Sequence, residues 1–496
     1  MLRKNMKKVC FLLLLFFIPI ALTACGTKQE SGNHPLTEEK PPAYGDILVR
    51  GDIGDASNLI PLLASDTASH NIAGMVYNGL VKYDKDMNIV GDLAESWDIS
   101  SNGLVITFHL RKGVKWHDGR PFTAADVLYT YQVTVDPKTP TAYAGDFLKV
   151  KKVDVIDDYT FRATYDKPFA PALISWSSAI LPRHLLAGKD ITQSSLSRHP
   201  IGTGPYKFKE WVAGQKIVLV SNPDYFEGQP YIDGRMTRII PDTATMFLEL
   251  RAQNIGMMGL TPLQYTRQTE NNLFQDNFNK YRYLSFAYTY MGYNLKNPLF
   301  ADKRVRQAIS YAINKDEIIS GVLLNLGKPA NGPYKPGTWA YNDQVKIYNY
   351  NPQKARELLS AAGWTTMNQD GILEKNGKPF TFEIVVNQGN ETRQKCAEII
   401  QRQLKEVGIT LEIIPSEAAE ATRRRNAGEF DVQQIGGGIF RQDPNVAGKY
   451  METVNYVPVG GNYGHYTNTK LDELFPAGRA TTNLAERKKI YTEAAT

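Results

Sequence analysis

The stretch LAESWDISSNGLVITFHLRKGVKWHDGRPFTAADVLYTY, residues 93–131, combines a β pattern with a helical one. Apolar and polar residues alternate in 106–113, which predicts a strand that buries one face. Residues 124–135 predict a helix, and Thr123 is placed to cap its start. Further on, 152–165 predicts a β-hairpin that turns at Asp157-Asp158. Strands and helices in such close succession indicate an α/β protein.

The same alternation extends along the chain on both sides of this stretch. Strands are expected at 46–53 and 288–295, and a long amphipathic helix at 302–323. Residues 351–364 predict a helix with Asn351 at the N-cap, Pro352 at the first helical position and Gly363 past its end.

Residues 380–415 follow a strand–helix–strand pattern. The expected strands are FTFEIVVN and ITLEIIP, with the helix ETRQKCAEIIQRQLKEVG between them. Two strands joined through a helix favour parallel pairing by a right-handed crossover.

Charge argues against nucleic acid as the main partner. The chain has 496 residues, 57 Lys or Arg, 51 Asp or Glu and a formal net charge of +6. Residues 1–24 carry Arg3, Lys4, Lys7 and Lys8 and no acid, so 53 basic residues against 51 acidic ones remain without them. A balance of +2 leaves no basic stripe of the kind that binds phosphate backbones.

Local catalytic and metal-binding motifs are absent from the sequence. No two of the seven histidines stand within four residues of each other, and there is no CxxC, GxSxG, SxxK or GxxxxGK[ST] motif. We therefore expect no enzyme, no cofactor and no metal site, although a site assembled from distant residues would escape this search.

The N-terminus predicts export and lipid anchoring. Basic residues 3–8 precede the apolar run Val9–Leu22, as in a secretory signal peptide over residues 1–24. Leu22-Thr23-Ala24-Cys25 resembles the bacterial lipobox, in which the cysteine is acylated and becomes the new N-terminus. Residues 25–45 would then be the lipidated Cys25 and a polar tether.

Only one cysteine would remain unmodified in the mature chain. Cys10 leaves with the signal and Cys25 would be acylated, so Cys396 has no partner for an intramolecular disulfide. Its place in an amphipathic helix favours a packed structural role over that of a nucleophile.

Five segments resemble, in the same order, the bacterial family 5 solute-binding proteins, the peptide/nickel type of receptors that serve ABC importers. Besides residues 93–131 they are IGTGPYKFKEW (201–211), MGYNLKNPLFADKRVRQAISYAINKDEII (291–319), NPQKARELLSAAGW (351–364) and AEIIQRQLKEVGI (397–409). The resemblance implies a two-lobed periplasmic-binding-protein type II fold with an extra α/β subdomain inserted in lobe one.

Domain limits follow by projecting the family's order onto this chain. Lobe one is expected at 46–75 and 198–285, the inserted subdomain at 76–197 and lobe two at 286–488. Residues 489–496 are expected to start a return of the chain to lobe one. Because the sequence ends in the helical pattern AERKKIYTEAAT, we expect this return to be truncated.

The loop IGGGIFRQDPN (435–445) departs from the pattern of the peptide-binding members. Those members hold the ligand's α-amine with an Asp four residues before a Pro, whereas Phe440 stands there in this chain. Arg441 can instead meet a carboxylate or phosphate with help from Arg393, or it can simply face solvent. Dipeptide-binding members place an Arg where this chain has Asn387.

Ligand contacts are therefore expected from loops at the lobe edges. The candidates are Ser65, Asp66, Thr67, Asn387, Arg393, Gly437, Gly438, Phe440 and Arg441. Ser65, Asp66, Thr67 and Asn387 have local turn or cap roles as an equal alternative.

The leading interpretation is a monomeric, lipid-anchored extracytoplasmic receptor that captures oligopeptides and delivers them to an ABC permease. A receptor of the same architecture for a metal chelate or a sugar derivative is the alternative. An exported hydrolase and a passive surface lipoprotein are the other classes that we weigh.

Overall fold

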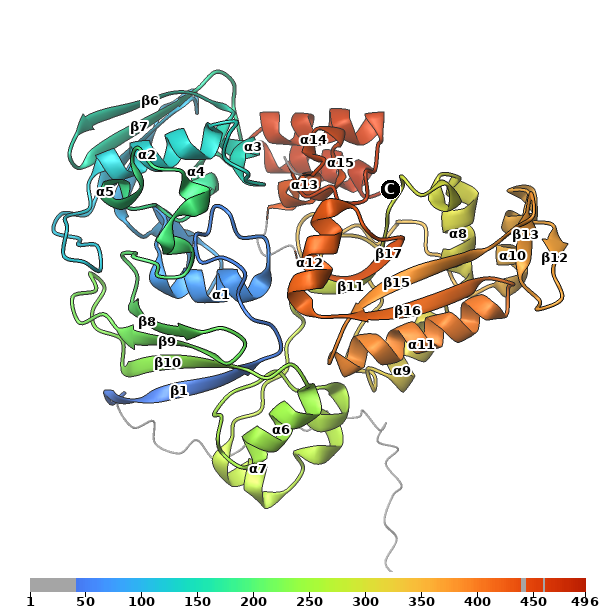
Figure 1. Ribbon diagram of the computed structural model, residues 1–496. Coiled ribbons are helices and arrows are strands. Elements are labelled where there is room, and N and C mark those ends of the chain that lie inside the picture. Colours follow the sequence, from blue (N-terminus) through green and yellow to red (C-terminus); the bar gives the residue numbers. More distant parts are fainter. Residues whose placement is uncertain (1–41, 439–442, 458–459) are drawn as a thin grey trace, which may run out of the picture. The chain divides into compact units, whose positions relative to one another are not determined.

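The computed structural model describes residues 42–438, 443–457 and 460–496, and its helices and strands are labelled in Figure 1. The α/β composition expected from the sequence is present, and three four-stranded sheets organise it.

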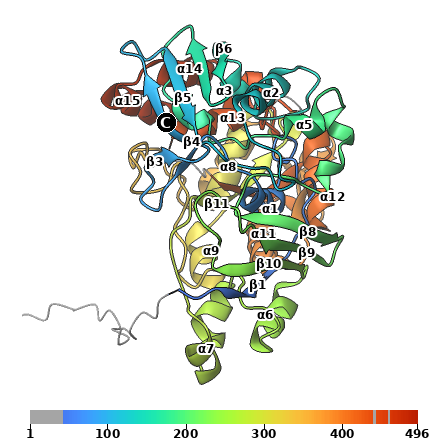
Figure 2. The ribbon, with the colours of Figure 1, turned by 90° about the vertical axis from the view of Figure 1, so that its left-hand side faces the viewer.

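The first sheet combines segments that lie far apart in the sequence. Its strands, in spatial order, are β1 (Gly45–Asp52), β10 (Ile232–Ile239), β9 (Lys216–Ser221) and β8 (Tyr206–Val212). β1 runs parallel to β10, and the other pairs are antiparallel. Apolar side chains of β8 and β9 pack with those of α1 (Thr67–Val76) in one core cluster. On the side of β1, α6 (Thr243–Arg251) and α7 (Asn272–Asn277) build a second cluster (Figures 1 and 2).

The insert sheet lies within the sequence interval between β1 and β8. Its order is β4 (Ala94–Ile99), β5 (Val105–Leu110), β7 (Thr160–Tyr165) and β6 (Val150–Asp157), all antiparallel. The same sequence interval contains the strands β2 (Val81–Tyr83) and β3 (Ile89–Gly91) and the helices α2 (Ala124–Val135), α3 (Ala144–Phe147) and α4 (Ala172–Ser175), which share the core of this sheet. It also contains α5 (Arg183–Leu186), η1 (Ile191–Gln193) and η2 (Ser195–Ser197), whose buried residues join the cluster of α1, β8 and β9.

Alternation along β5 and β7 explains the core of the insert sheet. Every second residue of both strands is buried, and Trp176 packs its ring edge against the inward Phe161 at 5.1 Å between centroids. The predicted strand at 106–113 corresponds to β5, and the predicted hairpin at 152–165 corresponds to β6 and β7. The predicted helix at 124–135 is α2, and Thr123 forms a capping box with Asp126 at its start.

The second sheet has the order β11 (Ala287–Tyr293), β17 (Val432–Gly438), β15 (Thr381–Asn387) and β16 (Thr410–Ser416). β15 and β16 are parallel and joined through α11 (Glu391–Lys405), so the predicted strand–helix–strand unit is confirmed. Its other helices are η4 (Pro298–Phe300), α8 (Lys303–Ala312), α9 (Lys315–Gly321), α10 (Pro352–Ala361) and α12 (Ala418–Ala427). A small sheet of β12 (Thr366–Met367), β13 (Leu373–Lys375) and β14 (Lys378–Pro379) adjoins it.

The prediction of a single helix over 302–323 is wrong. The chain leaves helical geometry at Ile313 and Asn314, and the Asn314 side chain accepts a hydrogen bond from the Glu317 backbone N–H to cap α9. A capping asparagine favours a new helix start over continuation. The expected helix at 351–364 is confirmed as α10, with Asn351 at its N-cap.

A helical cluster follows β17 in the sequence. It contains η5 (Pro444–Ala447), α13 (Gly448–Met451), η6 (Thr453–Asn455), α14 (Thr469–Ala480) and α15 (Leu484–Ala494). Tyr491 of α15 is fully buried in a core with Leu474 and Phe475 of α14. Asp443 accepts two hydrogen bonds from the buried Arg487 guanidinium at 2.9 Å each, which ties η5 to α15.

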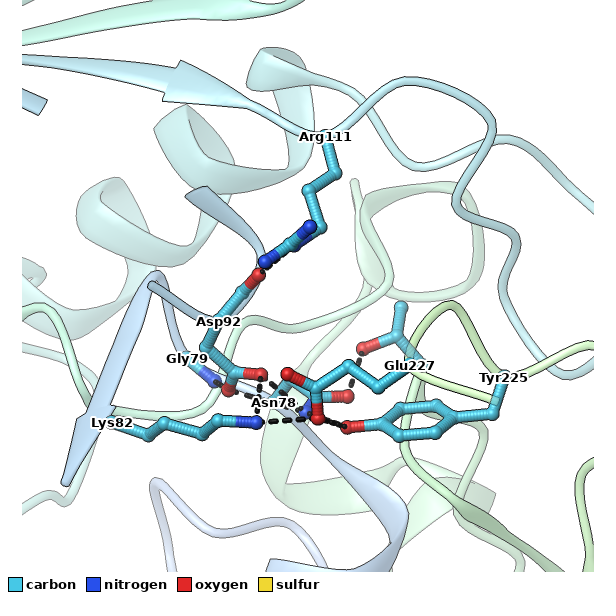
Figure 3. Close-up of polar contacts among 8 residues, drawn as sticks. Asn78, Gly79, Lys82, Asp92, Arg111, Tyr225 and Glu227 are labelled. Carbon is cyan, nitrogen blue, oxygen red and sulfur yellow. Dashed lines mark hydrogen bonds and ion pairs between the residues drawn. The ribbon is translucent and has the colours of Figure 1, made fainter. Parts of the chain in front are cut away.

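A buried polar network joins the segment 78–92 to the loop after β9 (Figure 3). The Asp92 carboxylate, 3% exposed, accepts hydrogen bonds from the Asn78 amide at 2.9 and 3.1 Å and from the Gly79 backbone N–H at 3.2 Å. Lys82 Nζ stands 3.7 Å from Asp92 Oδ1 and 2.5 Å from Glu227 Oε2. Burial raises the pKa of Asp92 to about 6, against the opposing effect of Lys82.

Asp92→Asn tests this network through pH. Because the native pKa of Asp92 is raised, its protonated form stabilises the fold below pH 4, and that contribution is lost as pH rises to about 6. The loss is on the order of 3 kcal/mol for a shift of this size. Urea unfolding between pH 4 and 7 should show that wild type loses stability relative to Asp92→Asn. Asp84→Asn is the control: the Asn88 backbone N–H lowers the pKa of Asp84, so the contribution of this carboxylate is lost only as pH falls below about 4, and wild type and Asp84→Asn should stay parallel between pH 4 and 7. Parallel pH profiles for wild type and Asp92→Asn would contradict the assignment.

Asp443→Asn tests the tie between η5 and α15. The substitution leaves the Arg487 guanidinium, 8% exposed, without a carboxylate, so we expect a loss of about 3–5 kcal/mol in the free energy of unfolding. Asp166→Asn, which breaks an exposed pair with Lys151, should cost no more than about 1 kcal/mol. Equal costs for the two variants would show that burial of the Arg487 charge does not matter.

Candidate ligand-binding site

A cavity of about 250 Å³ opens where loops that follow β1 face the end of β15, α12 and β17. We call it the central cavity. Its polar lining from the first sheet and the start of α1 is Asp52, Asp55, Ser57, Ser65, Asp66 and Thr67. Its polar lining from the second sheet and its helices is Asn387, Asn390, Arg393, Thr422, Arg425, Gln433 and Gln434. The cavity thus has one wall from each sheet.

Ser65, Asp66 and Thr67 stand together on the first wall, at the start of α1. The Asp66 carboxylate caps this helix, accepting from the Ser69 backbone N–H at 2.7 Å and from the Ser69 hydroxyl at 2.8 Å. It also accepts from the Ser57 hydroxyl, which fixes the preceding loop. Asp66 therefore has the local cap role that the sequence left open, while its position still borders the cavity.

Asn387 and Arg393 meet on the second wall because a parallel strand ends where the next helix begins. Asn387 is the last residue of β15, and Arg393 lies in the first turn of α11. The Asn387 amide oxygen accepts a hydrogen bond from Arg393 Nη1. Burial lowers the pKa of the Arg393 guanidinium.

Gly436 of β17 makes room for this arginine. A Cβ built on Gly436 would collide with Arg393 Nη2, so a side chain there and the observed guanidinium position exclude each other. The predicted contacts Gly437 and Gly438 end β17, where their backbones pair with Tyr288 and Ala287. Phe440, Arg441 and Cys25 lie outside the described residues.

The sequence analysis missed Arg425, Gln433 and Gln434. Arg425 lies on α12, with its guanidinium 4.5 Å from the ring centre of Tyr463, and its Nε has no hydrogen-bond partner among the described residues. Gln434 is 5% exposed, and its Oε1 lacks a partner within the same part of the chain. The available signal was a pair of glutamines inside an otherwise apolar strand pattern, since buried amides need partners.

A larger cavity of about 470 Å³ lies beside the Asp92 network. All of its lining comes from residues 61–225, so the second sheet contributes nothing to it. The central cavity is the better candidate for a ligand site because groups from two separate sheets converge there.

No set of three or more His, Cys, Asp or Glu side chains among the described residues is placed to hold a metal ion. None of the helices in that part of the chain has the length and apolar character to cross a membrane. Cys396 is buried, and burial raises the pKa of its thiol to about 11, as suits a packed structural residue.

Comparison with known proteins identifies close relatives over most of the chain. The oligopeptide-binding protein AppA of Bacillus subtilis is 34% identical over an alignment of 505 positions, which covers 99% of this chain and 91% of that protein. Its structure in complex with a nonapeptide matches with a TM-score of 0.86 over 92% of each chain. This match confirms the fold class expected from the sequence.

Other relatives have names that specify different ligands. Heme-binding protein A of Haemophilus influenzae is 29% identical, covering 96% of this chain and 89% of that protein. The structure of NikZ from Campylobacter jejuni in complex with Ni(L-His) is 30% identical, with a TM-score of 0.82 over 92% of this chain and 90% of that one.

A family model decides the classification. The description of that model is bacterial extracellular solute-binding proteins, family 5, middle region, and it matches residues 88–454. The resemblance seen in residues 93–131 and the four later segments is thereby confirmed. The chain belongs to the bacterial extracellular solute-binding proteins of family 5, which bind solutes and are not enzymes.

Proposed function

We propose that this protein is the lipid-anchored receptor of an ABC importer and captures oligopeptides in the central cavity. Its coarser role, the substrate-binding protein of an ABC importer, follows from the family. The observation that carries the proposal is the central cavity, with polar walls from two sheets that have separate cores.

Separate cores suit a receptor that closes on its ligand. Two rigid bodies that approach each other exclude water from the ligand, which strengthens each polar contact between them. To shift the closed form from 1% to 99% of molecules, a ligand must prefer it by about 5.5 kcal/mol. A permease that recognises the closed form would then receive only loaded receptors.

Peptides suit the charges of the two walls. Asp52, Asp55 and Asp66 stand on the first wall, and Arg393 and Arg425 on the second. A zwitterionic chain can present its amine to one side and its carboxylate to the other. The relative AppA, solved with a nonapeptide, supports the same ligand class.

A non-peptide solute is the second candidate, because the amine-binding Asp of the family is replaced by Phe440. The names of heme-binding protein A and the NikZ complex with Ni(L-His) show that relatives of similar identity bind such ligands. A metal chelate with carboxylates, or an acidic sugar derivative, would also suit a wall that carries two arginines.

The domain limits expected from the sequence are part of the proposal. Lobe one at 46–75 and 198–285 would hold the first sheet, the inserted subdomain at 76–197 the insert sheet, and lobe two at 286–488 the second sheet. Each of the three sheets falls almost entirely inside its proposed interval, which supports the division. The limit at 488 passes through α15.

Peptide capture predicts binding together with contraction. Native mass spectrometry of residues 28–496 should show masses in the range of short peptides, either co-purified or taken up from a casein digest. Small-angle scattering of the same sample should show a smaller radius of gyration with the digest than without it. A single non-peptide mass would favour the second candidate. A protein that binds no peptide and keeps its radius would contradict the proposal.

Lipid anchoring predicts a change of fraction in Cys25→Ser. In a bacterial host that processes lipoproteins, wild type should incorporate labelled palmitate and sediment with membranes, because acyl chains on one residue give durable anchoring. Cys25→Ser should lose the label and appear in the soluble exported fraction. Cys396→Ser is the matched control and should behave like wild type. Label that persists in Cys25→Ser would refute acylation at this residue.

A further inference from the structure

The loop between β15 and α11 touches the loop between β10 and α6. Gly389 of the first loop lies against Pro241 of the second, and a Cβ built on Gly389 would overlap the Pro241 carbonyl oxygen. The Thr243 hydroxyl also donates a hydrogen bond to the Gly389 carbonyl oxygen, at 3.4 Å. Under the proposed domain limits, Pro241 and Thr243 belong to lobe one and Gly389 to lobe two, so this contact joins the two lobes.

This contact stands at the rim of the central cavity. Asn387 and Asn390, which flank the turn that holds Gly389, both line the cavity. Asp52 lines the opposite wall, and its carbonyl oxygen accepts a hydrogen bond at 2.8 Å from the N–H of the residue before Pro241. The separation of the two walls at this rim therefore depends on how closely Pro241 and Gly389 approach.

Neither loop has spare length to absorb a side chain at position 389. Only three residues connect β15 to α11, and the Gln388 N–H among them donates to the Ser416 carbonyl of β16 at 2.8 Å. Three residues likewise connect β10 to α6, and the Asp242 carboxylate among them caps α6 by accepting from the Thr245 N–H at 2.7 Å. Each loop is held by its own sheet and helix, so a Cβ at position 389 would push whole lobes apart.

Gly389 meets two separate requirements at once. Its φ is +76°, in the left-handed region that glycine enters without strain. The approach of Pro241 adds a requirement for space, which has nothing to do with φ. Asparagine tolerates a positive φ better than alanine does, but its Cβ would still meet Pro241. Experiment can therefore separate the two requirements.

A second set of contacts joins lobe two to the inserted subdomain. The Ala170 N–H of the insert donates to the Arg479 carbonyl of α14 at 2.8 Å. Lys449 Nζ of α13 lies 3.9 Å from the ring centre of Tyr143, which belongs to the insert. The described arrangement is thus one in which the lobes already touch, as a closed receptor requires.

We propose that Gly389 is the positioning residue for lobe closure. The missing side chain admits the Pro241 carbonyl oxygen and lets the second wall reach the first, and this contact sets how far the movement goes. The inference rests on the proposed function, since it assumes that the lobes close on a ligand. With a methyl group at position 389, the rim must stay wider by about 1.5 Å or more to restore an ordinary van der Waals separation. Groups from both walls then no longer reach one ligand together.

Gly389→Ala and Gly389→Asn test this role, with Gly371→Ala and Gly371→Asn as matched controls. Gly371 lies in lobe two with the same φ of +76°, and beyond its chain neighbours no atom of the described residues lies within 4 Å of a Cβ built on it. Each pair of variants therefore shares the backbone strain, but only those at position 389 meet Pro241. Circular dichroism and the melting temperature show which variants are folded, and Gly389→Asn keeps the test available where Gly389→Ala is not.

Two measurements on the full mature chain report closure. Fluorescence titration with a casein digest gives an apparent Kd, which should rise about 10-fold or more in both variants at position 389 and stay within about twofold of wild type in both controls. Spin labels at the exposed positions Lys209→Cys on β8 and Lys405→Cys on α11, in a Cys396→Ser background, give the distance between the lobes. With the digest this distance should shorten in wild type and stay longer by about 1.5 Å or more in the variants at position 389.

The outcomes separate this inference from the proposed function. If the variants at position 389 bind the digest and close as wild type does, the role of Gly389 is refuted while the peptide receptor stands. If the controls at Gly371 lose affinity to the same extent, the effect is backbone strain, and the role is refuted as well. If wild type binds no digest, the peptide proposal fails, and the label distances without ligand decide on Gly389: a shorter distance in wild type than in Gly389→Ala supports its role, and equal distances refute it.

Discussion

The separation of the hydrophobic cores is the constraint on which the binding site depends. The second sheet closes its own core with α8, α10 and α11, while the first sheet packs against α1 on one side and α6 on the other. Each sheet and its helices bury their apolar side chains in their own core, so polar side chains remain where the two sheets face each other. A single merged core would have filled the central cavity.

Within the second wall, the arrangement depends on three residues from three elements. β15 ends at Asn387, α11 supplies Arg393 in its first turn, and β17 offers Gly436 beneath the guanidinium. Parallel strands joined through a helix place a strand end and a helix start at the same edge, which is where ligands bind in open α/β sheets. The site thus follows from topology, and its charge follows from the residues that happen to stand at that edge.

The elements that the sequence predicted correctly are those whose signals are local. The alternation of apolar and polar residues predicted β5 and β7, and capping residues predicted the starts of α2 and α10. The strand–helix–strand pattern predicted β15, α11 and β16. The helix expected at 302–323 failed because amphipathic spacing continued across a break. The sequence did contain the signal for that break, Asn314 followed three residues later by Glu317.

The candidate site was predicted only in part, because its contacts join residues far apart in the sequence. Asn387 and Arg393 could be placed near each other because they flank one turn. Arg425 and Gln434, in contrast, reach the cavity only through the packing of α12 and the pairing of β17 with β11 and β15, which no local pattern shows. The close approach of Arg393 Nη2 to Gly436 is likewise a property of three-dimensional packing.

Hydrogen exchange of the mature protein, with and without a saturating peptide mixture, tests the central claim most directly. Ligand held between both walls should slow exchange at residues 52–67 and also at 387–393 and 425–436, since these segments line the central cavity. Protection confined to one wall, or found instead around the cavity lined by residues 61–225, would contradict a site formed jointly by the two sheets.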